Sequence, residues 1–299
     1  MSFHRKLFLA AAGVILISLT PVPSRAQEST DNIFTWSGRV ASGATFGIRH
    51  FNGPIDVREG TGDRVEFRAE RRSRRSGELS FEVENGTDGV TICGVYRGRS
   101  ACDTGRNRGW DWEDGPPTSR LTVILPKGVR LFANTGNGDV TVANASNDLD
   151  IRSGNGDVRI SMTAGQVDVT TGNGELEVMG ATGPVRATTG NGRVYVTTST
   201  GPVTVRTGNG EIDVRMRTLS STADMTFTTG NGAVTVALPS SYKGEIDAST
   251  GHGDFRSDFE IRIMGRLNPR HIRGMIGEGG TQRIRMSSGN GRIELRKSN

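Results

Sequence analysis

The chain has 299 residues, of which 33% are hydrophobic and only 6% aromatic, and its 42 glycines are about twice the usual share. Its formal net charge is +5, but three of its 37 basic residues lie in an amino-terminal segment that we expect to be removed. The remaining 34 basic and 32 acidic side chains are nearly balanced, and the expected export argues against nucleic acid as the routine partner. No later stretch approaches the eighteen apolar residues of a membrane span.

The first 26 residues have the organisation of a secretory signal peptide. A basic start at Arg5 and Lys6 is followed by an apolar run over residues 7–19, and then by prolines and a small-residue site ending at Ala26. The run is too short to cross a membrane, and no cysteine follows the expected cleavage site. We therefore expect an exported protein that starts at Gln27 and resides in the periplasm or outside the cell.

Residues 27–130 are rich in strand patterns but have no regular period. Alternating apolar residues predict strands over residues 34–40, 44–51, 55–57, 64–70, 79–83, 90–95 and 121–125. Because the end of a repetitive β-structure exposes unpaired backbone groups, we expect this irregular β region to cap the repeats that follow.

Cys93 and Cys102 are the only cysteines. In an exported chain, two cysteines at this short spacing predict a disulfide that closes a loop. Neither a Cys-x-x-Cys motif nor a nearby histidine supports a redox or zinc site.

A long polar loop over residues 98–117 carries Trp110 and Trp112 among carboxylates. The two tryptophans, with Arg97 and Arg99 nearby, are candidates for binding a glycan or another anionic envelope component. The alternative is structural, with the tryptophans packing the loop onto the body and the arginines lying in a solvated loop. The sequence favours the structural alternative.

The segment Gly-Asn-Gly recurs every eighteen residues from Gly136 to Gly210, and again at Gly230 and Gly289, with a Gly-His-Gly variant at Gly251. Apolar pairs follow each such turn and recur nine residues later, as in Val140/Val142 and Leu149/Ile151. A fixed period with β-branched alternation predicts in-register parallel strands. The nine-residue offset favours two sheets over a triangular coil. The predicted fold is therefore an all-β parallel solenoid over residues 131–299 with 18 residues per coil, and crossover statistics favour a right-handed one.

The repeat asparagines are expected to stack one above another. They can form a hydrogen-bonded amide ladder, or they can be present only because asparagine tolerates a left-handed backbone. Both possibilities stay open for the set Asn137, Asn155, Asn173, Asn191, Asn209 and Asn231.

Calcium binding is a weak hypothesis for the corner carboxylates. Calcium β-rolls repeat a carboxylate at every corner. Here the corner position holds Asp139 and Asp157, but Arg193 and Ala233 interrupt the column. Asp139 and Asp157 remain the best calcium candidates, and we expect no metal site.

No pattern points to catalysis or to a cofactor. The outward columns mix charges of both signs, which favours cross-strand pairs such as Arg159 with Glu177 and Asp168 with Arg186 over paired catalytic carboxylates. The histidines are scattered, and each Gly-Asn-Gly leads into a strand, whereas a phosphate-binding loop leads into a helix. The sequence therefore predicts a protein without enzymatic activity or cofactor.

The repeat lapses over residues 259–285, where the sequence is rich in arginine and glycine, and resumes with Ser-Gly-Asn-Gly-Arg-Ile-Glu-Leu at residues 288–295. We interpret this as an insertion before a closing coil.

Three segments carry a resemblance to a known family: Leu-Thr-Val-Ile-Leu-Pro-Lys-Gly at residues 121–128, the serial Thr-Gly-Asn-Gly repeats, and the terminal Gly-x-Ile-Gly-x-Gly-Gly with the closing coil. The chain resembles the bacterial putative-adhesin family, exported β-solenoid proteins of unknown function, over about residues 33–297. The resemblance implies an envelope β-solenoid and supplies no catalytic residues.

Together these features predict a non-enzymatic scaffold or adhesin-like protein of the cell envelope or surface, whose partner is an envelope glycan or another surface protein. The alternative is a periplasmic carbohydrate-binding or regulatory protein that acts through the Trp110/Trp112 loop and two arginine clusters. These clusters are Arg71, Arg72, Arg74 and Arg75, and Arg97, Arg99, Arg106 and Arg108.

Overall fold

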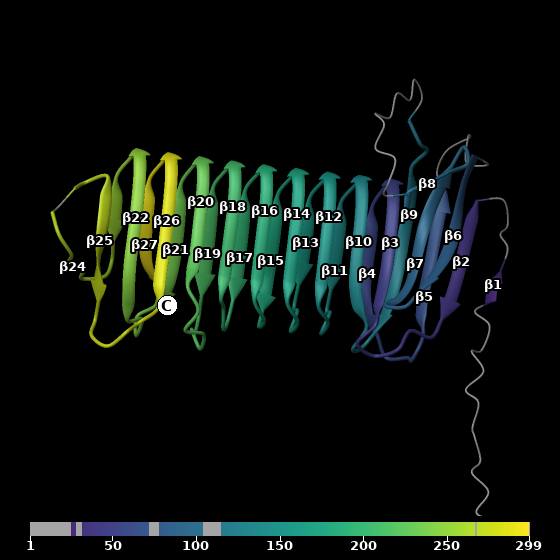
Figure 1. Cartoon of the computed structure of the whole chain (residues 1–299), viewed down its shortest axis with the longest axis horizontal. Helices are drawn as coiled ribbons and strands as arrows, with labels where there is room; N and C mark the ends of the chain where they lie inside the picture. The colour runs from purple at the N-terminus through teal and green to yellow at the C-terminus, as the bar shows by residue number, and fades with distance from the viewer. Residues whose placement is uncertain (1–24, 28–31, 72–77, 104–114, 267, 299) are drawn as a thin grey trace, which may run out of the picture.

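A computed structural model describes residues 25–27, 32–71, 78–103, 115–266 and 268–298. These residues form 27 β-strands and no α-helix. The strands make one 13-stranded and one 14-stranded sheet, which face each other along an elongated rod (Figure 1). The expected signal peptide lies outside the described residues, except for its last two, which belong to β1 (Arg25–Gln27).

Six regular coils form the middle of the rod, and each contributes one strand to each sheet. Their strands in the 14-stranded sheet are β10 (Arg130–Asn137), β12 (Leu149–Asn155), β14 (Val167–Asn173), β16 (Val185–Asn191), β18 (Val203–Asn209) and β20 (Met225–Asn231). The partners in the 13-stranded sheet are β11 (Val140–Ala143), β13 (Val158–Ser161), β15 (Leu176–Ala181), β17 (Val194–Thr198), β19 (Ile212–Met216) and β21 (Val234–Pro239). All neighbouring coils pair in parallel, so the predicted two-sheet parallel β-solenoid is confirmed.

The core of the rod consists of the alternating apolar residues of both sheets. Val169 of β14 and Val178 of β15, for example, are almost completely buried, while Thr170 between two inward residues is exposed. Burying one such side chain stabilises the fold by about 1.5–3 kcal/mol. The eighteen-residue register keeps like residues in contact, as in the pair Val167 and Val185, so each coil depends on its neighbours for its burial.

The two glycines of each Gly-Asn-Gly meet different requirements. At Gly174, the second glycine of its turn, φ is +157° and a Cβ would lie 2.1 Å from the carbonyl oxygen of Gly156. At Gly172, the first glycine, φ is unexceptional, but a Cβ would lie 2.5 Å from the carbonyl oxygen of Gly154. Close stacking of successive coils therefore requires the first glycine, and both stacking and a positive φ require the second.

The asparagines between these glycines form a continuous side-chain ladder. Each Nδ2 donates to the Oδ1 of the asparagine in the adjacent coil at 2.6–2.7 Å. None of them has a positive φ, which argues against their presence for backbone tolerance. In spatial order the ladder comprises Asn52, Asn137, Asn155, Asn173, Asn191, Asn209, Asn231 and Asn290. The ladder therefore extends at its two ends, by Asn52 and Asn290, beyond the set expected from the repeats.

A second ladder, of buried hydroxyl groups, lies directly beside the asparagines. The Oγ1 of Thr171 donates to the carbonyl oxygen of Gly156 at 3.0 Å, and the equivalent residue of each neighbouring coil repeats this bond. The donors are Thr135, Ser153, Thr171, Thr189, Thr207, Thr229, Ser288 and Thr250, at 2.8–3.4 Å. The constant threonine or serine before each Gly-Asn-Gly was a signal for this ladder that sequence analysis did not use.

The amino-terminal boundary of the solenoid differs from the predicted one. The strands β3 (Thr45–Asn52) and β4 (Ile55–Gly60) pair in parallel with β10 and β11 and form a complete coil. The sequence placed them in an irregular cap, because one coil gives no period. The remaining strands of this end are β2 (Ile33–Gly38), β5 (Val65–Arg71), β6 (Leu79–Gly86), β7 (Gly89–Tyr96), β8 (Arg99–Ser100) and β9 (Ser119–Pro126). They cover this coil with a mixture of parallel and antiparallel pairs.

The carboxyl-terminal end also departs from the prediction. The expected closing coil, β26 (Arg283–Asn290) and β27 (Ile293–Ser298), is not the terminal one. It lies between the coil of β20 and β21 and the coil of β22 (Gly244–His252) and β23 (Phe255–Ser257), as Figure 1 shows by its yellow strands between green ones. The predicted insertion supplies β24 (Arg262–Ile263) and β25 (His271–Ile276). The strand β25 pairs antiparallel with β22, and β24 pairs antiparallel with β25 at the edge of the sheet.

Candidate functional site

A groove of about 1040 Å³ crosses the outer surface of the 13-stranded sheet from β13 to β27. We call it the Met-Tyr groove and define it by Met162, Met179, Tyr195, Arg215, Ala237 and Arg296. It runs perpendicular to the strands, because equivalent outward positions of successive coils line it. Small side chains such as Thr197 and Ala237 make its floor low between the larger residues. It is therefore long and open, as suits a macromolecular partner.

Two methionines at one end of the groove are unusually exposed. The exposed fractions of Met162 and Met179 are 63% and 40%. The two residues lie on adjacent coils, joined by a hydrogen bond from the backbone nitrogen of Met162 to the carbonyl oxygen of Met179 at 2.8 Å. Met162 has a φ of +50°, which places its side chain outside the inward–outward alternation of the strand. Neighbouring exposed apolar side chains in a soluble fold are typical of an interaction surface.

Tyr195 occupies the middle of the groove and is held by Arg215. The guanidinium carbon of Arg215 lies 5.6 Å from the centre of the tyrosine ring. Arg215 also donates Nε and Nη2 to the two carboxylate oxygens of Asp213, at 3.3 and 3.1 Å. The hydrogen bond and charge of Asp213 raise the pKa of Arg215 above its ordinary value. The ring and the guanidinium plane are thus pre-positioned for a partner.

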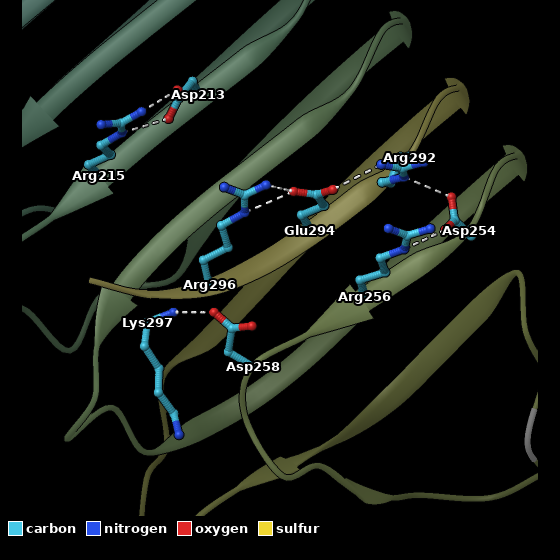
Figure 2. Close-up of polar contacts among 9 residues, drawn as sticks. All are labelled: Asp213, Arg215, Asp254, Arg256, Asp258, Arg292, Glu294, Arg296 and Lys297. Carbon is cyan, nitrogen blue, oxygen red and sulfur yellow. Dashed lines mark hydrogen bonds and ion pairs between the residues drawn. The ribbon is translucent and has the colours of Figure 1, made fainter. Parts of the chain in front are cut away.

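A chain of ion pairs extends beyond the groove at the carboxyl-terminal end of the rod (Figure 2). Glu294 accepts hydrogen bonds from Arg296 and Arg292, and Arg292 continues to Asp254 at 3.0 Å. Burial of Glu294 opposes its ionisation, but the hydrogen bonds from Arg296 and Arg292 outweigh it and lower its pKa. The hydrogen bond from Arg292 likewise lowers the pKa of Asp254. Because solvent screens these pairs, they stabilise the fold only slightly.

The other outward charges are paired across strands as the sequence suggests. Arg159 lies 3.8 Å from Glu177, and Arg186 lies 3.8 Å from Asp168. Both pairs are exposed. Such alternation of sign describes a solvated β-surface rather than a set of carboxylates grouped for acid–base chemistry.

The calcium candidates Asp139 and Asp157 have another role in the structure. The Oδ1 of Asp139 accepts the backbone amide of Asp157 at 2.9 Å, and the Oδ1 of Asp157 accepts that of Glu175 at 2.9 Å. Each carboxylate thereby satisfies an amide at the next corner. Within the described ranges, the one group of three potential metal ligands is Glu84 with Cys93 and Cys102, whose two sulfurs are bonded to each other.

The described residues singled out near the polar loop, Arg97 and Arg99, lie at the amino-terminal end of the rod, away from the Met-Tyr groove. Trp110 and Trp112 fall outside the described residues, as do Arg72, Arg74, Arg75, Arg106 and Arg108. Arg97 pairs with Glu78 at 2.9 Å and lies over the ring of Tyr96, and Arg99 belongs to the short strand β8 at the amino-terminal end. Cys93 and Cys102 form a disulfide that ties β7 to the turn after β8.

His50 is buried in the first coil and occupies the position of a ladder hydroxyl. Its Nε2 lies 2.9 Å from the Oγ of Ser119, and burial lowers its pKa to about 4. Ser119 is fully buried and His50 is nearly so, although His50 also lines a small surface cavity with Asn52 and Pro116. We interpret this serine–histidine pair as part of the packing beneath the groove-bearing sheets.

The fold is thus a two-sheet parallel β-solenoid with a long open groove on the outer surface of its 13-stranded sheet. A family model described as Toastrack DUF4097 matches residues 115–295. The chain belongs to this family, a domain of unknown function, which agrees with the resemblance that the repeats suggested.

No curated protein matches the chain. The solved structures that match it include the following two. One is a putative adhesin from Bacteroides fragilis, at 11% identity and a TM-score of 0.35, covering 89% of this chain and 98% of that one. The other is a putative cell adhesion protein from Clostridium sporogenes, at 11% identity and a TM-score of 0.26, covering 88% and 99%. Among the described residues, no helix has the length and hydropathy of a membrane span.

Proposed function

We propose that the chain is a non-enzymatic, adhesin-like scaffold of the cell envelope or surface, which binds a protein partner in the Met-Tyr groove. The observation that carries the proposal is the composition of the groove. Methionine, tyrosine and arginine are enriched at protein–protein interfaces, and Met162, Met179, Tyr195 and Arg215 meet in one place. An extended segment of a partner, lying across the strands, is the occupant that such an open groove favours.

The rigidity of the rod supports a scaffold role. Asparagine and hydroxyl ladders bridge successive coils on one edge, and parallel backbone pairs do so on both sheets. A surface held in place before binding loses little conformational freedom when the partner arrives. Tyr195 gains further order from its contact with Arg215.

Export is supported by two features of the chain. The disulfide between Cys93 and Cys102 suits an oxidising compartment, and the first 26 residues carry the signal-peptide pattern. We include in the proposal the domain organisation that follows, with residues 1–26 removed and the solenoid acting as the presenting body. Cleavage after Ala26 would take two of the three residues of β1 from the edge of the sheet.

The proposal is tested by capturing partners from the native envelope with the full chain as bait. Met179→Glu places a charge in the groove, and Tyr195→Ala removes its central ring. The matched control is Thr141→Ala, an exposed outward residue of β11 beyond the groove. We expect both groove variants to lose at least tenfold of the captured protein while the control retains it. Equal capture by all four proteins would reject the groove as the binding surface.

A further inference from the structure

The Met-Tyr groove has two chemically different ends. Over β13 and β15 it is lined by the exposed side chains of Met162 and Met179. Over β19 to β27 its lining is charged, and four of the five charged residues are basic. The acid is Asp213, and the basic residues are Arg215, Arg217, Arg296 and Lys297. A partner segment that fills the groove therefore meets an apolar end and a basic end.

The carboxylates at the basic end are already bonded to arginines (Figure 2). Asp213 accepts from the Nε and Nη2 of Arg215 at 3.3 and 3.1 Å. Glu294 accepts from the same two nitrogens of Arg296, and also from Arg292. Within the described ranges, the Nη1 of Arg215 and that of Arg296 make no hydrogen bond. Each of these guanidinium groups thus keeps donors for a further carboxylate.

Two more positive charges at this end have no carboxylate partner. In the part of the chain that the structure describes, the exposed side chain of Arg217 forms no ion pair or hydrogen bond. The Nζ of Lys297 lies 5.4 Å from the centre of the Phe259 ring. It points away from Asp258, which accepts the backbone nitrogen of Lys297 (Figure 2). An aromatic ring attracts an ammonium group but does not neutralise it. Even with Glu294 and Asp258 counted, basic side chains outnumber acidic ones at this end.

Ala237 lies between the two paired arginines. Arg215, Ala237 and Arg296 occupy registered positions on the neighbouring strands β19, β21 and β27. The Cα atoms of the two arginines are therefore about 10 Å apart, which is twice the strand spacing. The methyl group of Ala237 forms a low floor between them. A carboxylate over Ala237 lies within reach of both guanidinium groups and can accept from each.

The distance between the two ends sets the spacing of the partner's side chains. The strand that carries Met179, β15, lies three strand spacings from β21, which carries Ala237, or about 14 Å. An extended polypeptide advances about 3.3 Å per residue. An apolar side chain on Met179 and a carboxylate over Ala237 thus belong to residues about four positions apart, which lie on the same face of an extended chain. Nucleic acids and uronic-acid glycans carry negative charge but offer no such apolar side chain.

We infer, on the basis of the proposed protein site, that the groove takes an acidic extended segment of the partner, with an apolar residue on Met179 and a carboxylate over Ala237. Arg215 and Arg296 bind the carboxylate. Arg217 and Lys297 favour a segment that carries further negative charge.

The test is a selection from a phage-displayed library of random dodecapeptides, with the full chain as bait. We expect the enriched peptides to be acidic and to carry Asp or Glu roughly three to five positions from an apolar residue. One enriched peptide is then synthesised, and its Kd is measured by calorimetry. Replacement of its acidic residues by the corresponding amides should weaken binding at least tenfold.

Protein variants locate the peptide in the groove. Arg217→Gln/Arg296→Gln should bind it at least tenfold more weakly, and Arg217→Gln alone, which breaks no side-chain hydrogen bond or ion pair among the described residues, at least threefold. The matched control is Arg206→Gln, which removes an exposed arginine of β18 in the other sheet. It lowers the net charge equally and should bind like the parent protein. Thermal melting accompanies each variant.

The inference is overturned if no peptide is enriched, if the enriched peptides are neutral or basic, or if the arginine variants keep the parent affinity. It is also overturned if hexagalacturonate binds the parent protein more tightly than the peptide does.

Met179→Glu and Tyr195→Ala separate this inference from the proposed function. If both variants keep the parent affinity for the peptide, the Met-Tyr groove is not the protein site and both proposals fail. If both lose affinity while the amide-substituted peptide binds the parent protein as tightly as the acidic one, the groove binds protein without using acidic residues. In that case only the inference of an acidic segment fails.

Discussion

The side-chain amide of Asn290 donates to the Oδ1 of Asn231 at 2.6 Å, although 59 residues separate the two in the chain. Between Asn137 and Asn209, ladder partners are only 18 residues apart. The ladder therefore follows the spatial stack of coils rather than chain order. It includes the coil of β26 and β27 and stops where β22 presents His252.

This inverted order can be checked by engineered disulfides. Thr226 and Arg285 are registered neighbours on β20 and β26, whereas Asp247 lies one strand further away on β22. Neighbouring strands are about 4.8 Å apart, within the Cα separation that a disulfide needs, whereas twice that distance is too far. The pair Thr226→Cys/Arg285→Cys should oxidise readily, and Thr226→Cys/Asp247→Cys should not. Peptide mapping under non-reducing conditions decides, and the reverse pattern would mean that the coils stack in chain order.

The asparagine ladder should contribute most where an amide has two partners. Asn173 donates to Asn155 and accepts from Asn191, whereas Asn290 makes one described side-chain bond, to Asn231. Asn173→Ala should lower the free energy of unfolding by about 1 kcal/mol, and Asn290→Ala by about half of that, since each exposed bond contributes modestly. Urea titrations measure both. Equal losses would indicate that the ladder bonds are incidental.

The buried hydroxyl ladder should contribute more per hydrogen bond than the exposed amides. Thr171→Val keeps the shape of the side chain but removes the donor to the carbonyl oxygen of Gly156. The partly buried carbonyl then loses this bond, at a cost of about 1 kcal/mol. Thr170→Val, on the exposed side of the same strand, is the control and should be nearly neutral. A similar effect of the two substitutions on urea unfolding would contradict a role for the hydroxyl.

His50 should make the fold sensitive to acid. Burial lowers its pKa from 6.5 to about 4, so the unfolded chain binds a proton that the folded chain rejects between these values. The stabilisation is present above pH 6.5 and is lost as the pH falls toward 4, by about 3 kcal/mol in total. His50→Thr places the usual ladder hydroxyl there and should remove this part of the pH dependence. Unfolding free energies of both proteins from pH 7 to pH 4 should diverge by this amount, and parallel curves would contradict it.

The repeat unit of this fold was predictable because one physical requirement recurs in every coil. Alternating apolar pairs such as Val158/Ile160 must face the core, and Gly-Asn-Gly must turn the chain. The spacing of these residues therefore predicts the length of each coil and the register of its strands. The order of coils at the ends was not predictable in this way. Ile246 and Ile284 offer the same inward side chain, so either strand satisfies the neighbouring core equally well.

Two histidines interrupt the side-chain ladders near the two ends of the rod, and their positions in the sequence could have indicated where the ladders stop. His50 takes a hydroxyl position in the first coil, and His252 takes an asparagine position in the terminal one. A ladder needs a donor and an acceptor at every inner position, and only an end tolerates a different residue, as is general for terminal repeats. The Met-Tyr groove left no comparable signal. The exposure of Met162 arises from its positive φ at a corner, and the spacing of apolar residues does not encode it.

The strands β26 and β27 follow β22–β25 in the chain, yet they lie inside the stack. The last residues of the chain therefore join the coil of β22 and β23 to the rest of the rod. If the chain folds from its amino terminus, successive coils can stack in order only as far as β21. The strands β22 and β23 can then pair with the stack only after β26 and β27 have formed between them and the coil of β20 and β21. Folding of the rod can therefore be completed only when the last residues of the chain are available.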